Sequence, residues 1–149
     1  MKPADTDPPQ QQTASPKAPA QKEVSIPQAL ELATEHHNAG NLSTAEKLYQ
    51  TILAAKPDHA TATHLLGVIA HQKGEDALAV DLITKAITLQ PNLAEAHNNL
   101  GIVQQTRSRL NDAIASYRQA VALKPDFAQA HGNLGLALKD AGKFEDAVS

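Results

Sequence analysis

One spacing dominates the sequence: from residue 26 onward, the chain repeats itself every 34 residues. A proline, a leucine, an alanine and a turn residue all keep this register. The prolines are Pro57, Pro91 and Pro125, and the leucines are Leu32, Leu66, Leu100 and Leu134. The alanines are Ala45, Ala79, Ala113 and Ala147, and the turn position holds Gly40, Gly74, Ser108 and Gly142. A period of this length is the signature of stacked units that bury their apolar faces against one another.

Each unit predicts two helices. Apolar residues recur at helical spacing, a glycine or polar break follows, and a second amphipathic run ends before the proline. In the second unit the pattern predicts helices over residues 60–73 and 76–89, separated at Gly74. Pro91 closes the unit, because proline lacks the N–H that a continuing helix needs.

A helix start in the first unit is expected near Ser43. Ser43 and Glu46 have the three-residue spacing of a capping box, in which two side chains satisfy free backbone N–H groups at the beginning of a helix.

Residues 1–23 differ from the rest of the chain in composition. They hold five of the nine prolines and three consecutive glutamines. Such a segment cannot bury enough apolar area to offset the entropy lost on ordering, so we expect a disordered tail, either a plain linker or a proline-rich ligand. The folded domain is expected over 24–149, with repeats at about 26–59, 60–93, 94–127 and a truncated 128–149.

Residues 26–149 resemble the tetratricopeptide repeat, whose pattern matches the unit PNLAEAHNNLGIVQQTRSRLNDAIASYRQAVALKP. The resemblance implies an all-α fold, a right-handed α-α superhelix of about three and a half helix-turn-helix repeats. The family keeps small residues where two helices cross closely, since only a nearly absent side chain allows that approach. The matching positions are Gly67, Gly101 and Gly135 in the first helices and Ala79, Ala113 and Ala147 in the second helices.

The fourth unit ends soon after its second helix is expected to begin. The apolar sides of Leu134 and Val148 would then lack their usual cover, and a solenoid needs a polar terminal cap to stay soluble. We expect either a fragment of a longer protein or a homo-oligomer formed through this uncapped C-terminal end.

The composition argues against several classes of function. The net charge of -3, with 13 scattered Lys and Arg residues, provides no basic surface for nucleic acid. There is no cysteine, no signal-peptide core and no stretch long enough for a membrane span, so a cytoplasmic location is the default. No phosphate loop, nucleophile motif or carboxylate pair appears, and we therefore expect neither catalysis nor a cofactor in this chain.

Four of the seven histidines follow the repeat as well, since His37 and His71 are 34 residues apart, and so are His97 and His131. His97 and His131 are expected to be partly buried structural residues. His37, His64 and His71 are expected near one another on the concave face. They lack the helical spacing that is usual for zinc ligands, which argues against a zinc site. We expect a modest pH dependence of binding instead, since such histidines charge below about pH 6.5.

The sequences AEAHNNLG and FAQAHGNLG are similar to the repeat region of the O-linked N-acetylglucosamine transferases and their bacterial relatives. In that family a ladder of asparagines grips the backbone of the substrate peptide. The resemblance implies that Asn99 and Asn133 are two rungs, while Leu65 and Glu31 occupy the equivalent places of earlier units. Ordinary solvated asparagines on a helix face are the alternative. Lys and Arg are absent from the positions where related repeats clamp a terminal carboxylate, which disfavours that mode of binding.

The sequence therefore favours a module that binds a partner peptide or protein in the concave groove of a solenoid. Two alternatives stay open: the N-terminal region of a larger enzyme, such as an O-GlcNAc-transferase-like glycosyltransferase with catalysis beyond residue 149, and a self-assembling scaffold. The residues expected to line the groove are His64, His71, Asn98, Asn99, Gln105 and Asn133.

Overall fold

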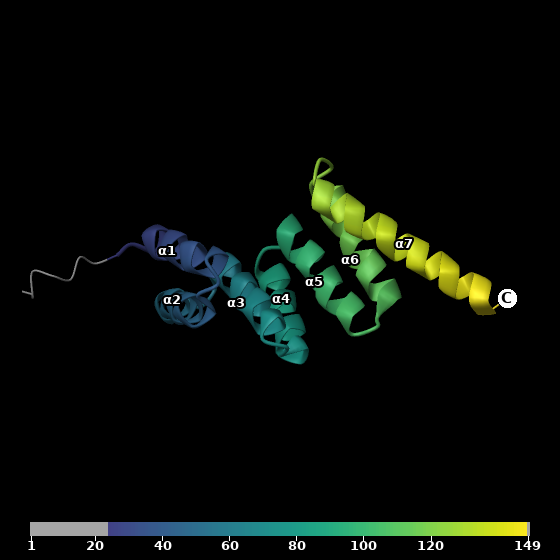
Figure 1. The fold of residues 1–149 in the computed structure, drawn as a ribbon. Helices are drawn as coiled ribbons and strands as arrows, with labels where there is room; N and C mark the ends of the chain where they lie inside the picture. Colours follow the sequence, from purple (N-terminus) through teal and green to yellow (C-terminus); the bar gives the residue numbers. More distant parts are fainter. Residues whose placement is uncertain (1–23, 149) are drawn as a thin grey trace, which may run out of the picture.

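The computed structural model describes residues 24–148, with side chains as far as Lys143. This part of the chain is all helical, as predicted, and forms an extended row of paired helices (Figure 1). The helices are α1 (Ile26–Asn38), α2 (Leu42–Ala55), α3 (Ala60–Gln72), α4 (Asp76–Leu89), α5 (Ala94–Thr106), α6 (Leu110–Leu123) and α7 (Ala128–Val148). None of them is long and apolar enough to cross a membrane. The predicted disordered tail, residues 1–23, lies outside the described residues.

Three hairpins, α1–α2, α3–α4 and α5–α6, turn in the same way. Each turn contains a residue with positive φ: Gly40 at 83°, Gly74 at 82° and Ser108 at 60°. The same backbone hydrogen bond, 2.8 Å long, closes each first helix: Asn41 N–H to His36 O, Glu75 N–H to Ala70 O and Arg109 N–H to Gln104 O. This is the Schellman arrangement, which satisfies a carbonyl left free at the helix end.

Pro57 and Pro91 lie between consecutive hairpins, as predicted, and Pro125 lies between the third hairpin and α7. Each second helix ends two residues before its proline, and the residue preceding the proline leaves the helical region. That residue has nearly the same φ each time: -140° at Lys56, -142° at Gln90 and -135° at Lys124. The proline therefore ends each unit at the same angle, which lets equal units stack.

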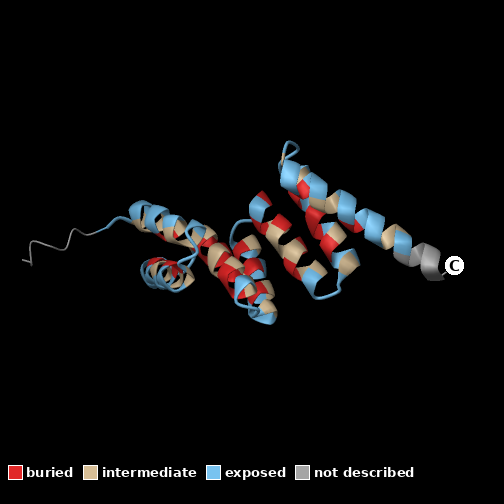
Figure 2. Ribbon diagram, viewed as in Figure 1, coloured by how far each residue is buried: buried red, intermediate tan, exposed pale blue. Residues whose placement is uncertain are grey.

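The predicted close crossings occur in the second and third hairpins. A Cβ added at Gly67 would lie 2.7 Å from Ile83 Cγ1, and one at Gly101 would lie 2.5 Å from Tyr117 Cε1. Ile83 and Tyr117 are themselves buried, so the absent side chain is what allows the two helices to approach. Buried residues follow the faces along which neighbouring helices meet (Figure 2).

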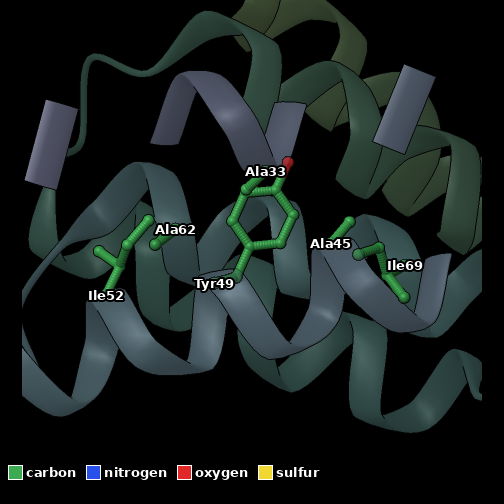
Figure 3. Close-up of a cluster of buried hydrophobic side chains, with 6 residues drawn as sticks. All are labelled: Ala33, Ala45, Tyr49, Ile52, Ala62 and Ile69. Atoms are coloured by element: carbon green, nitrogen blue, oxygen red, sulfur yellow. The ribbon is translucent and has the colours of Figure 1, made fainter. Parts of the chain in front are cut away.

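The first hairpin uses alanine where the next two use glycine. Ala33 is fully buried, and the ring of Tyr49 extends from α2 toward it (Figure 3). Ile52 from α2 and Ile69 from α3 belong to the same cluster, which therefore links the first hairpin to the second. Two further clusters of buried residues follow along the row, and each of the three combines residues of neighbouring units.

The predicted capping box at Ser43 is wrong. The helix α2 already begins at Leu42, its N-cap residue is Asn41, and no side chain caps it. The turn at Gly40 delivers the chain directly into the helix, so Ser43 lies inside it. The capping box is instead at α1, where Ser25 and Gln28 bond each other's backbone N–H groups.

The predicted break at Gly142 is also wrong, since α7 continues through this residue as one helix of 21 residues. Bending a helix is favourable only when a second helix packs back on the first. In the described part of the chain, α7 is the last helix and no later helix packs back on it. Accordingly, a Cβ added at Gly135 would meet nothing within 4 Å in the described part of the chain, unlike one at Gly67 or Gly101.

Candidate functional site

The first helices of successive units, α1, α3, α5 and α7, form one wall of the molecule, called here the inner face. The helix α5 contacts both α3 and α7. Three side-chain hydrogen bonds connect consecutive first helices, and each joins residues 35 apart. They are His37 Nε2 to Gln72 Oε1 (2.7 Å), Asn99 Nδ2 to His64 Nε2 (2.8 Å) and Asn133 Nδ2 to Asn98 Oδ1 (3.0 Å). Each unit thereby orients a polar side chain of the next.

His64 lies behind this face, with 3% of its surface exposed. Burial lowers its pKa to about 4, against a smaller upward effect of Glu95, and nearby His37 lowers it further. The ring is therefore neutral near pH 7, and its Nε2 accepts the hydrogen bond from Asn99. The expectation that His64 charges just below pH 6.5 is wrong, because a buried ring loses too much hydration on protonation.

Asn98 is likewise covered, with 1% exposed. It was expected to line the groove, but its oxygen holds the amide of Asn133 from beneath. Asn99 and Asn133 remain half-buried and lie nearer the solvent. Of the three asparagines, the inner face presents these two, while Asn98 fixes the orientation of one of them.

A groove of about 450 Å³ opens between α5 and α7 and contains two of the predicted residues, Gln105 and Asn133. The hydroxyl of Tyr117 forms part of its lining and donates to Gln105 Oε1 at 2.8 Å. This α5–α7 groove is lined by Ile102, Gln105, Thr106, Tyr117, Asn133 and Leu136. It combines amide groups with an apolar surface.

His71 is not brought into this groove. Its Nδ1 donates to Asp76 Oδ1 at 2.7 Å, which ties the end of α3 to the start of α4. His37 bonds Tyr49 and Gln72, so His37, His64 and His71 have separate partners. No group of three ligating side chains suited to a metal ion occurs within residues 24–143.

His97 and His131 each bond the loop that precedes their helix, but the predicted partial burial is correct only for His97 and wrong for His131. Each Nε2 donates to the carbonyl of the proline six residues earlier, at 3.1 Å for His97 and Pro91 and at 2.7 Å for His131 and Pro125. His97 is half-buried whereas His131 is exposed. The bond fixes the loop that enters each first helix.

Sequence reasoning missed the apolar part of the groove, Ile102 and Leu136. A signal was present: Val68, Ile102 and Leu136 are 34 apart and lie on first helices, one residue after Gly67, Gly101 and Gly135. An apolar residue there cannot reach the hairpin core, so it faces the inner side.

Comparisons with known proteins agree with this architecture. The family model described as "Tetratricopeptide repeat" matches residues 30–94, and a second described as "TPR repeat" matches residues 106–142. No curated protein sequence matches the chain significantly.

Several solved structures are similar. An O-GlcNAc transferase mutant of Thermobaculum terrenum aligns over 76% of the chain, with 34% identity and a TM-score of 0.74. The chain spans only 22% of that enzyme. MamA aligns over 84% of the chain and 73% of its own length, with 26% identity and a TM-score of 0.71. The first TPR domain of Spaghetti (RPAP3), bound to an HSP90 peptide, aligns over 78% of the chain and 93% of its own, with a TM-score of 0.72; at 16% identity it shows the common fold alone.

Proposed function

Because the chain belongs to the tetratricopeptide repeat family, we propose that it binds an extended segment of a partner protein along the inner face. Repeats of this family are protein-interaction modules that generally carry no catalysis of their own. The inner face is the natural site, since it presents polar side chains from several units in one row.

The observation that carries the proposal is the state of Asn99 and Asn133. A side-chain amide has two N–H donors and an oxygen with two lone pairs. Asn99 donates one N–H to His64, and Asn133 donates one N–H to Asn98. Each asparagine therefore retains its oxygen and a second N–H for a partner. An extended peptide has unpaired backbone N–H and C=O groups whatever its sequence, and two oriented amides can pair with them.

The charge of the inner face favours this mode over capture of a carboxylate. The positions where related repeats place Lys or Arg hold neutral or acidic residues here: Leu30, Thr34, His64, Val68, Leu65, Glu95, Asn99 and Ile102. His64 supplies no positive charge near pH 7, because burial keeps it neutral. A terminal carboxylate would therefore find no cation at these positions.

A displayed library of nine-residue peptides tests the proposal. Peptides retained by the wild-type chain should bind Asn99→Ala/Asn133→Ala about ten- to thirtyfold more weakly, since two hydrogen bonds of about 1 kcal/mol each are lost. Gln119→Ala is the matched control, because this amide is exposed on α6 away from the inner face. Failure to retain any peptide, or equal binding by the double variant, would contradict the proposal.

The similarity to the O-GlcNAc transferase supports a second proposal: the chain is the repeat region of a larger glycosyltransferase whose catalytic part lies beyond residue 149. Sequencing the gene downstream of that point tests it. A continuing reading frame with a transferase domain is expected, and a stop codon would rule it out.

The exposed leucines of α7 support a third proposal, that the chain assembles with further copies of itself. Leu136 is 61% exposed and Leu138 42% exposed, on a helix that lacks a hairpin partner in the described part of the chain. Sedimentation at micromolar concentration should then give an oligomer, and a monomer would dismiss this proposal.

A further inference from the structure

Building on the proposed function, we infer that the α5–α7 groove receives one large uncharged apolar side chain of the partner segment and pairs with the backbone beside it. The groove would thus be the position that selects among sequences, whereas the asparagines recognise any backbone.

The apolar part of the groove supports this preference. Leu136 is largely exposed, Ile102 is half-buried, and the buried ring of Tyr117 lies between α5 and α7. The volume of about 450 Å³ falls within the ordinary range of ligand pockets, about 300–1,000 Å³. A leucine or phenylalanine side chain placed there would remove the surface of Leu136 from water, while an alanine would not reach across it.

The absence of charge in the lining excludes ionised side chains. All six lining residues are neutral. An aspartate or lysine of the partner would lose hydration on entering and find no opposite charge in return. The groove therefore discriminates by polarity as well as by size.

The two amides offer complementary groups to the backbone. The Tyr117 hydroxyl occupies Gln105 Oε1, which leaves the N–H donors of Gln105 free. Asn98 occupies one N–H of Asn133, which leaves the oxygen of Asn133 as an acceptor. Burial raises the pKa of Tyr117, so its hydroxyl keeps the proton that it donates. One donor from α5 and one acceptor from α7 match the C=O and N–H of an extended residue.

This pairing favours an extended segment over a helix or a second copy of the chain. The backbone groups of a helix are already bonded within the helix. A helix that covered the groove would bury Gln105 and Asn133 without partners for their free groups, and that burial is unfavourable.

The test uses the full chain and four displayed nine-residue libraries, whose central residue is fixed as Leu, Phe, Asp or Lys. We expect the wild type to enrich the Leu and Phe libraries about tenfold over the Asp and Lys libraries, as burial of one large apolar side chain requires. Leu136→Ser should remove this preference. Leu138→Ser is the matched control, because Leu138 is an exposed leucine of the same helix outside the groove.

The backbone contact is tested with the best peptide and its analogue in which an ester replaces the central amide, so that the N–H is lost. The ester should bind the wild type about tenfold more weakly than the amide, and Asn133→Ala should bind both alike. An equal loss in the wild type and in Asn133→Ala would show that Asn133 does not accept this N–H.

The remaining outcomes separate the groove from the proposed function. If no library binds, both fail. If peptides bind and lose affinity in Asn99→Ala but all four libraries are enriched equally, only the groove assignment fails. A wild-type dimer that Leu136→Ser converts to a monomer would show that a second copy covers the groove, and would also overturn the inference.

Discussion

Asn133 Nδ2 donates to Asn98 Oδ1 at 3.0 Å, from α7 to α5 and across 35 residues of sequence. Asn99 donates in the same way to His64, from α5 to α3, so one contact recurs with two different acceptors. The amides that we propose to face a partner are thus held by the preceding unit. The hydrogen bonds that join consecutive first helices therefore also orient the side chains of the inner face.

A double-mutant cycle should detect this contact in the unbound protein. Asn98→Ala and Asn133→Ala should show a coupling of about 1 kcal/mol in the free energy of unfolding, the usual value for a hydrogen bond in folded proteins. Urea unfolding of the two single variants and the double variant measures it. The control cycle combines Asn98→Ala with Asn111→Ala, a substitution of an exposed residue on α6. The changes in unfolding free energy of these two substitutions should be additive.

The stability of the chain should depend on the protonation of His64. Its pKa is about 4 in the folded state and near 6.5 in the unfolded state, so the stabilisation is complete above pH 6.5. As the pH falls from 6.5 to 4, the unfolded state gains a proton that the folded state does not. The free energy of unfolding should therefore drop by about 3 kcal/mol.

His64→Gln isolates this effect, because glutamine can still accept from Asn99 but does not titrate. Urea unfolding between pH 7.5 and pH 4.5 measures the free energy of unfolding of the wild type and of the variant. On acidification, the wild type should lose more of this free energy than the variant. A difference that stays constant would mean that His64 titrates normally in the folded chain.

Two glycines at equivalent positions should respond in opposite ways to alanine. Gly101→Ala places a Cβ against the Tyr117 ring and should lower the free energy of unfolding by about 1 to 3 kcal/mol. Gly135→Ala meets no atom within 4 Å and should raise it by up to about 1 kcal/mol, because alanine favours a helix. Thermal unfolding of the two variants distinguishes them. Equal destabilisation would mean that α7 is covered by a partner in solution.

Ser108→Gly should stabilise the third hairpin. Ser108 has φ of 60°, whereas the same position in the other hairpins holds Gly40 and Gly74. A left-handed conformation costs an ordinary residue about 1 to 2 kcal/mol, and glycine avoids this cost. Glycine also loses more conformational freedom on folding, which offsets part of the stabilisation. We expect a net gain of about 0.5 to 1 kcal/mol by urea unfolding; Gly74→Ser should show a loss of similar size.

The fold could be predicted from the sequence because its determinants are local and repeated. Pro91 and Gly74 end helices through the conformation of their own backbone. The contact of Gly101 with the bulky Tyr117 can be predicted from the spacing of the two residues in the repeat. Gly142 shows the limit of such patterns: a turn residue makes a hairpin only when a second helix is present to pack back.

The inner face was less predictable, since it depends on contacts between units. Asn98 and Asn99 are adjacent and chemically identical, yet one is covered and the other is half-buried. Which of them faces outward depends on the rotation of α5 against α7, and repeat register alone does not give that rotation. The sequence alone predicts a normal titration for His64, because the burial that lowers its pKa arises from the same packing between units.

The most direct test of the central claim is to observe the side-chain amides of the inner face while a selected peptide binds. In a nitrogen–proton NMR titration, the amide resonances of Asn99 and Asn133 should shift with peptide concentration, while those of Asn111 and Gln119 on α6 should stay in place. Shifts confined to Asn111 and Gln119, with Asn99 and Asn133 unmoved, would contradict binding on the inner face.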